Sequence, residues 1–187
     1  MNTKNVRDLM VPLSDYATIS EDATLHDAVK ALHNAQLRCQ KDQYLHRAVL
    51  AYDNNKKITG KLSATDIIRS VEPKYRQFEE PDRKLKTNLS RFGLSSEFLS
   101  SMVKKYYLWE EDFDVLIKKA AKQKVRDVMD KPDKDEFVTE NTSLAEAVHM
   151  LVIGNHQSLL VVKEDDIVGV LKLTDVFKYM CDRILES

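Results

Sequence analysis

The stretch Val6-Arg-Asp-Leu-Met10 returns as Val125-Arg-Asp-Val-Met129, 119 residues further along the chain. A second stretch, Gly60-Lys-Leu-Ser-Ala-Thr-Asp-Ile67, returns as Gly169-Val-Leu-Lys-Leu-Thr-Asp-Val176 at an offset of 109 residues. Similar segments in the same order indicate a structural unit that occurs twice in one chain. Because the two offsets differ, the first copy is the longer one, with its extra residues mostly in the middle of the copy.

Each copy predicts the order β-α-β-β-α. In the first copy, Leu25, Ala28 and Leu32 are spaced as one face of an amphipathic helix. The capping box Thr24-x-x-Asp27 starts this helix, and Ser63 opens the last helix of the copy. Short apolar runs bounded by turn residues predict the strands, at 17–20, 47–52 and 58–62 in the first copy and at 136–139, 157–162 and 167–171 in the second.

A single copy is too small to be stable alone. A unit of roughly 60 residues buries little surface, and its sheet leaves an apolar face that needs a partner. We therefore expect a mixed α/β (α+β) fold in which the two copies pack face to face about a pseudo-twofold axis. The expected division is a first unit at 1–73, an insert at 74–122 and a second unit at 123–187.

The insert resembles neither copy. Its second half carries two apolar stripes at helical spacing, one from Phe98 to Tyr106 and one from Phe113 to Ala120. These stripes predict a helical hairpin that packs on the body of the protein or on a second subunit. A docking arm for a partner protein is the alternative.

Composition narrows the possible partners. The 187-residue chain carries 29 Lys and Arg against 30 Asp and Glu, a net charge of −1, so we expect neither nucleic acid nor a membrane as a partner. No apolar run is long enough to span a bilayer, and the N-terminus lacks the apolar core of a signal peptide. With Cys39 and Cys181 as its only cysteines, the chain carries no disulfide framework, and a cytoplasmic location is expected.

The sequence lacks the common catalytic motifs. No G-x-S-x-G, H-E-x-x-H, P-loop or G-x-G-x-x-G pattern occurs. The five histidines have no Cys or acidic partners at the spacing of metal ligands. We therefore expect no enzyme activity, no metal and no required cofactor.

The duplicated strand–helix junctions are the candidate binding sites. Each helix N-terminus offers free backbone N–H groups and the positive end of a helix dipole, which suit a phosphate. Ser63 could add a hydroxyl donor, and the carboxylates of Asp66 and Asp175 could accept hydrogen bonds from both hydroxyls of a ribose. Taken alone, Ser63-x-x-Asp66 is also an ordinary capping box. In the second copy Lys172 replaces the serine and cannot cap, yet the aspartate recurs.

These motifs resemble the cystathionine β-synthase (CBS) domain pair, or Bateman module. The resemblance rests on the repeated V-R-D-[LV]-M opening, the helix entry that includes L-x-[DE]-A-V, and the G-h-h-x-x-T-D-h stretch before the final helix, where h is hydrophobic. It covers most of the chain outside residues 74–122. It implies the paired β-α-β-β-α fold, dimerisation into a flat disc of four units, and two clefts that take AMP, ADP, ATP or S-adenosylmethionine.

The resemblance also implies roles for individual residues. Asp66 and Asp175 match the ribose-binding aspartate, and Ser63 matches the hydroxyl on the phosphate side. Lys172 departs from the family's Ser or Thr and could bind a phosphate as a point charge or fill the cleft with its own side chain. The other matched positions are Thr65 and Thr174 beside the aspartates, Ile19 and Val138 flanking the adenine, and His46, Arg47, Ala48, His156, Gln157 and Ser158 at the entry to the central strands.

Together these features predict a stand-alone regulatory module. It would bind an adenine nucleotide as an energy sensor, form a homodimer and act on another, unknown protein. Two alternatives remain. One is a scaffold of the same fold whose clefts stay empty, and the other is a small nucleotide hydrolase.

Overall fold

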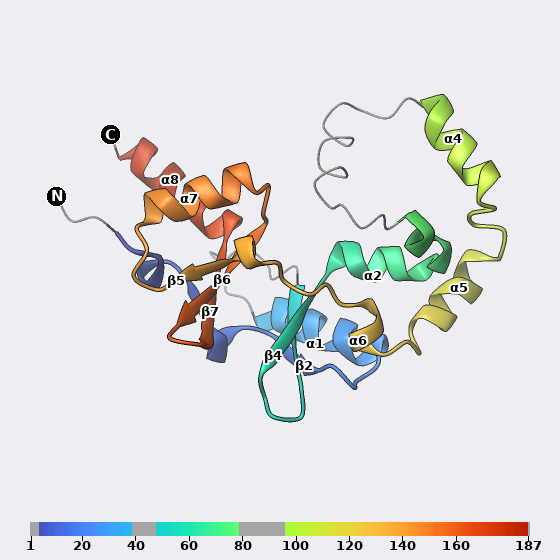
Figure 1. The fold of residues 1–187 in the computed structure, drawn as a ribbon, viewed down its shortest axis with the longest axis horizontal. Helices are drawn as coiled ribbons and strands as arrows, with labels where there is room; N and C mark the ends of the chain where they lie inside the picture. Colours follow the sequence, from blue (N-terminus) through green and yellow to red (C-terminus); the bar gives the residue numbers. More distant parts are fainter. Residues whose placement is uncertain (1–3, 39–47, 79–95, 187) are drawn as a thin grey trace.

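Two sheets of matching design form the centre of the protein. The computed structural model describes residues 4–38, 48–78 and 96–186. The first copy forms a three-stranded sheet and the second a four-stranded one, and in each a parallel pair precedes an antiparallel hairpin (Figure 1). The three-stranded sheet has the order β2 (Thr18–Ser20), β3 (Ala48–Tyr52), β4 (Ile58–Ser63). The four-stranded sheet has the order β1 (Val11–Pro12), β7 (Asp166–Lys172), β6 (Ser158–Lys163), β5 (Phe137–Thr139).

The helices complete the predicted β-α-β-β-α order in both copies. The capping boxes at Thr24 and Ser63 form as expected, and Lys172 makes no capping hydrogen bond. Helices α1 (Leu25–Arg38) and α2 (Ala64–Val71) belong to the first copy, and α7 (Leu144–Ile153) and α8 (Leu173–Leu185) to the second. The remaining helices are α4 (Ser96–Lys105), α5 (Phe113–Ala120) and α6 (Val125–Val128), with 3-10 turns η1 (Val6–Asp8), η2 (Leu13–Asp15), η3 (Pro73–Phe78) and η4 (Lys134–Glu136).

The central strands are buried on both faces. Because successive side chains of a strand point to opposite faces, Val49 and Ala51 of β3 lie in the core of the first unit, whereas Leu50 points the other way. Leu50 shares a separate cluster with Leu160 of β6, which holds the equivalent position in the second copy. The copies therefore pack sheet against sheet, as the apolar faces predict.

The opening segment of each copy packs on the other copy. Val6 is fully buried in the core of the second unit, and Val125 is fully buried in the core of the first. Their backbone N–H groups donate to Thr142 and Ala23, both at 2.9 Å. Strand β1 continues the exchange by pairing with β7, so the N-terminal segment lies against the second unit (Figure 1).

Two glycines make room for the exchanged segments. A Cβ atom at Gly169 would lie 2.6 Å from the backbone oxygen of Val11 and 3.0 Å from the sulfur of Met10. A Cβ atom at Gly60 would clash first with the side chain of Met129. The glycine and the methionine of the repeated motifs therefore meet across the two copies.

We expect Gly169→Ala to destabilise the fold by about 1–3 kcal/mol, because an overpacked site must move its surroundings. At Gly169 the nearest obstacle is the backbone of β1 at 2.6 Å, whereas at Gly60 the flexible Met129 side chain can rotate away and the backbone oxygen of Asp130 is 3.0 Å distant. Gly60→Ala is thus the matched variant with the smaller expected effect. Urea denaturation measures both, and a larger loss for Gly60→Ala would contradict this account.

The insert packs on the first unit. Leu116 and Ala120 of α5 are buried, and Ala120 belongs to the core of that unit. The indole of Trp109 packs against Tyr75, and its backbone N–H donates to the buried carboxylate of Glu72 at 2.7 Å. Helix α5 thus lies on the body of the protein, with α4 further out, and the two helices follow one another along the chain and do not pack side by side as the predicted hairpin (Figure 1).

Candidate functional site

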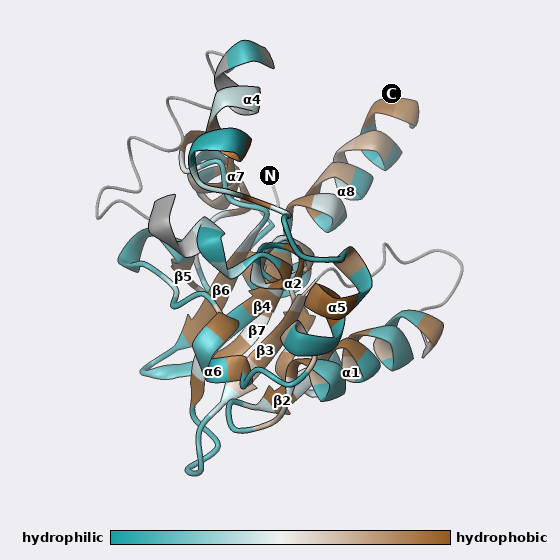
Figure 2. Ribbon diagram, turned by 90° about the vertical axis from the view of Figure 1, so that its right-hand side faces the viewer, coloured by the Kyte–Doolittle hydropathy of each residue, from teal (hydrophilic) through white to brown (hydrophobic). Residues whose placement is uncertain are grey.

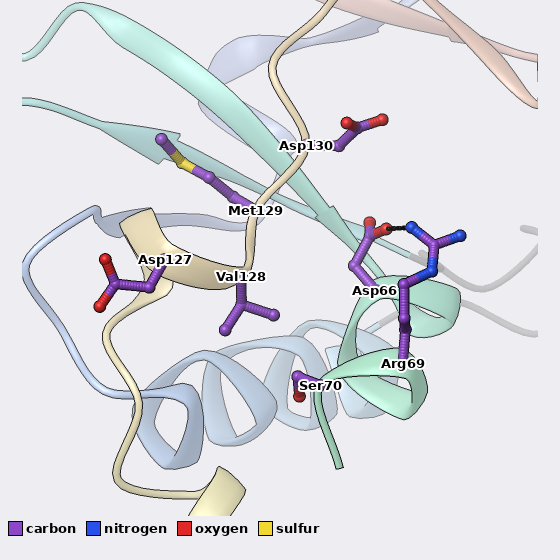
Figure 3. Close-up of a pocket in the computed structure, with 7 residues that line it drawn as sticks. All are labelled: Asp66, Arg69, Ser70, Asp127, Val128, Met129 and Asp130. Atoms are coloured by element: carbon purple, nitrogen blue, oxygen red, sulfur yellow. Dashed lines mark ion pairs between the residues drawn. The ribbon is translucent and has the colours of Figure 1, made fainter. Parts of the chain in front are cut away.

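Both copies contribute to a hollow at the first strand–helix junction. Asp66, Arg69 and Ser70 line it from α2, and residues 127–130 line it from the opening segment of the second copy (Figure 3). Its volume is about 110 Å³, whereas ligand pockets usually measure about 300–1,000 Å³. The hollow is therefore smaller than a usual ligand pocket, and only part of a drug-sized molecule would fit inside it.

Asp66 is held in place by the start of its own helix. Its Oδ2 accepts hydrogen bonds from the backbone N–H of Ser63 at 2.8 Å and from the Ser63 hydroxyl at 2.5 Å. Its Oδ1 lies 3.6 Å from the guanidinium of Arg69. A carboxylate offers about four acceptor positions, so Oδ1 keeps capacity for a ligand hydroxyl.

Arg69 is the cation of this hollow. It stands one helical turn after Asp66, and the two side chains meet at the rim (Figure 3). Asp127 also lines the hollow, but its carboxylate is directed away from Asp66, while Asp130 lies above the pair (Figure 3). The sequence analysis did not predict Arg69 or residues 127–130 as site residues, although residues 127–129 belong to the repeated motif. The i, i+3 spacing from Asp66 could have indicated Arg69, whereas the exchange that brings in residues 127–130 has no local signal.

The equivalent junction of the second copy is closed by an ion pair. The Lys172 side chain is 9% exposed, and its Nζ lies 3.2 Å from Oδ2 of Asp175. Tyr16, which comes from the first copy, lies close enough for the charge of Asp175 to act on it. Burial, and secondly the Asp175 charge, raise the pKa of the Tyr16 phenol above its ordinary value. The Tyr16 hydroxyl therefore stays protonated at neutral pH.

Of the remaining predicted positions, Ala48 and Ser158 are the strand partners of Ser63 and Lys172, whereas the two positions expected to flank an adenine lie in the cores. Val138 is buried in the core of the second unit, and Ile19 packs against the core of the first. Neither is among the residues that line the hollow at Asp66. Thr65 is exposed and Thr174 partly buried. The structure thus brings Ser63 and Asp66 together, and Lys172 and Asp175, without placing an adenine-flanking side chain beside them.

The strand-entry residues have backbone and structural contacts. The carbonyl of Gln157 accepts from Leu173 N–H at 3.0 Å, which ties the start of β6 to the start of α8. His156 Nε2 is buried, 3.4 Å from Asp135 Oδ2. Ala48 and Ser158 are buried. His46 and Arg47 lie outside the described residues.

Two further properties concern the described ranges only. Within residues 4–38, 48–78 and 96–186, no group of three or more His, Cys, Asp or Glu side chains could hold a metal ion. None of the helices in these ranges combines the length and the hydropathy needed to cross a membrane.

The geometry defines a tandem module, with two sheets back to back, exchanged opening segments and an aspartate at each strand–helix junction. A family model of the CBS domain matches residues 6–73 and 125–182, and the chain belongs to the CBS-domain family. No curated protein matches the sequence.

Solved structures agree with this assignment. The crystal structure of CBSX2 in complex with AMP is 17% identical, with a TM-score of 0.57 over 96% of this chain and 97% of that one. A CBS domain-containing protein from Bacillus anthracis is also 17% identical, with a TM-score of 0.62 over 96% and 94%. One from Agrobacterium tumefaciens is 16% identical, with a TM-score of 0.59 over 96% and 95%. At these identities the likeness concerns the fold.

Proposed function

We propose that the chain is a regulatory module that binds an adenine nucleotide at Asp66 and acts on a partner protein, without catalysis of its own and in the cytoplasm. The observation that carries this proposal is the position of Asp66, a carboxylate fixed by its helix cap at a hollow that both copies line. The structure of CBSX2, a protein of the same fold, contains AMP. That ligand class is the one we propose here, with ADP, ATP and S-adenosylmethionine as its other members.

Asp66 and Arg69 fit a ribose and an adjacent phosphate, whereas Asp127 and Asp130, which also line the hollow, disfavour a phosphate beside them. The two ribose hydroxyls would donate to the Asp66 carboxylate, as acidic residues do in other nucleotide sites. Arg69 would supply a positive charge with several donors to the phosphate. Arg69 is 45% exposed and lies 3.6 Å from Asp66, so its guanidinium is close to a ligand bound at this carboxylate.

Binding at this place would act on the arrangement of the two copies. A ligand in the hollow touches α2 of the first copy and residues 127–130 of the second. It therefore stabilises the arrangement in which both walls fit it, by the difference in its affinity for the available states. A partner protein that contacts both copies would sense that change.

We expect Asp66→Ala to weaken AMP binding about tenfold or more, because hydrogen bonds to a charged group contribute about 1.5–3 kcal/mol. The variant also loses the Asp66 half of the capping box, while Ser63 still caps α2 through the backbone N–H of residue 66. Ser143→Ala is the matched control, since Ser143 caps α7 through the N–H of Glu146 and does not line the hollow. Isothermal titration calorimetry with AMP measures the effect, and unchanged affinity in Asp66→Ala would contradict the assignment.

A scaffold without a nucleotide is the second candidate function. Helix α8 projects from the body (Figure 2). Several of its apolar side chains are exposed, among them Phe177, Met180 and Ile184. Exposed apolar patches of this kind mark interaction surfaces, which favours a homodimer or a complex with the regulated protein. A thermal stability that ignores millimolar AMP would favour the scaffold, because a ligand of the folded state must stabilise it by mass action.

A further inference from the structure

Lys172 is a buried lysine that the proposed function does not use. It precedes α8 at the same place where Ser63 precedes α2. Its side chain is 9% exposed and that of Asp175 is 18% exposed, with 3.2 Å between Nζ and Oδ2. A buried ammonium needs a counter-ion, and Asp175 provides it.

The equivalent aspartates of the two junctions, Asp66 and Asp175, therefore have different partners. In the first, a neutral serine hydroxyl donates to Asp66 and leaves the second carboxylate oxygen facing the loosely placed Arg69. In the second, a full positive charge is buried against Asp175. Ribose hydroxyls carry no charge, so a ligand that displaced Lys172 from Asp175 would leave the buried ammonium without its counter-ion.

The second junction is not the more buried of the two, since the Asp175 side chain is 18% exposed and that of Asp66 is 9% exposed, but its surroundings differ. Tyr16 is buried and lies within the electrostatic reach of Asp175. The residue of the second copy that is equivalent to Tyr16, 119 positions later, is Asp135. Its side chain is 70% exposed. A buried aromatic ring thus stands on one side of the pseudo-twofold axis, and an exposed carboxylate on the other.

We propose that the Lys172 side chain occupies the second cleft in place of a ligand, so that each chain binds one nucleotide, at Asp66. This inference rests on the proposed function. It makes Lys172 the residue that sets the number of nucleotides bound, and Ser63 the residue that keeps the first cleft open.

The test is the stoichiometry of AMP binding by calorimetry on the full chain. We expect the wild type to bind one AMP per chain, with at least a tenfold loss of affinity in Asp66→Ala. Lys172→Ser restores the arrangement of the first junction and should raise the number to two. The reciprocal variant Ser63→Lys places a lysine beside Asp66 and should abolish binding, and the double variant should bind one AMP at Asp175.

The outcomes separate the two proposals. Two AMP molecules per wild-type chain, or one that persists in Asp66→Ala, would overturn the role of Lys172 and leave nucleotide binding intact. No binding by the wild type or by Lys172→Ser would overturn the proposed function together with this inference. Should Lys172→Ser fail to fold, a structure of the wild type soaked with AMP decides, since density beside Asp175 contradicts the inference.

Discussion

Replacing Lys61 with Met is expected to lower the free energy of unfolding by about 3–5 kcal/mol, because it leaves the carboxylate of Glu136 buried without its counter-ion. The Lys61 Nζ lies 2.7 Å from Oε2 of Glu136, and the two side chains are only 15% and 8% exposed. Lys61 is on β4 of the first copy, whereas Glu136 ends η4 of the second. The ion pair therefore joins the two copies across a region with little water.

Chemical denaturation of three variants measures this effect. Glu136→Gln should also be strongly destabilising, because it leaves a buried ammonium without its counter-ion. The double variant Lys61→Met with Glu136→Leu should recover most of the loss, since replacing both members of a buried pair with apolar groups is often neutral. Lys163→Met is the surface control. Its partner Glu140 lies 3.6 Å away, and Lys163 is 60% exposed, so about 0–1 kcal/mol is expected.

A loss of stability from Lys61→Met no larger than that from Lys163→Met would contradict the conclusion that the Lys61–Glu136 pair is buried.

The Lys61–Glu136 pair is also connected to the candidate site. Lys61 exchanges two backbone hydrogen bonds with Asp130, at 2.9 and 2.8 Å. Asp130 lines the hollow at Asp66, so the segment that forms one wall of the hollow is attached to the strand that carries the ion pair.

The sequence allowed the repeated unit to be predicted because its signals are local. The capping boxes at Thr24 and Ser63 and the helical spacing of Leu25, Ala28 and Leu32 are properties of neighbouring residues. The exchange of opening segments is not local. Val6 and Val125 sit in nearly identical motifs, and nothing in either motif states which of two similar cores the valine enters.

The candidate site likewise combines residues with local sequence signals and residues whose position depends on the other copy. Asp66 was predicted because its spacing from Ser63 and its recurrence at Asp175 can be seen in the amino-acid sequence itself. The two interpretations of Lys172 stayed open because neither its burial nor the position of Tyr16 near Asp175 can be predicted from neighbouring residues in the sequence. His46 and Arg47 lie outside the described residues, so their proposed contact with a base stays a prediction, as do the adenine-flanking roles of Ile19 and Val138.

Truncating the leucines at the pseudo-twofold axis should separate packing between the copies from packing within them. Leu50 and Leu160 are buried in one cluster between the sheets, with Tyr16 and Val170. We expect Leu50→Ala and Leu160→Ala each to cost about 2–5 kcal/mol, from lost burial and from the cavity that remains. A typical domain is stable by only about 5–15 kcal/mol, so either loss is a large fraction of the total.

The double variant distinguishes a shared cluster from two independent cores. Because Leu50 and Leu160 lie in the same cluster, the second truncation enlarges a cavity already opened by the first, and the combined loss should be smaller than the sum of the single losses. Leu62 and Leu159 are the matched control, since they are equally buried but belong to the separate cores of the two units. Their losses should add within about 0.3–0.5 kcal/mol.

Urea denaturation in the presence of trimethylamine N-oxide, which stabilises folded states, keeps the double variants within measurable range. Additive losses for Leu50 and Leu160 would mean that the two sheets do not share a core. In that case a ligand at Asp66 could not act on the arrangement of the copies through this interface. If the combined loss of stability for Leu50 and Leu160 is smaller than the sum of the single losses, while the losses for Leu62 and Leu159 add, the two copies are coupled through this cluster.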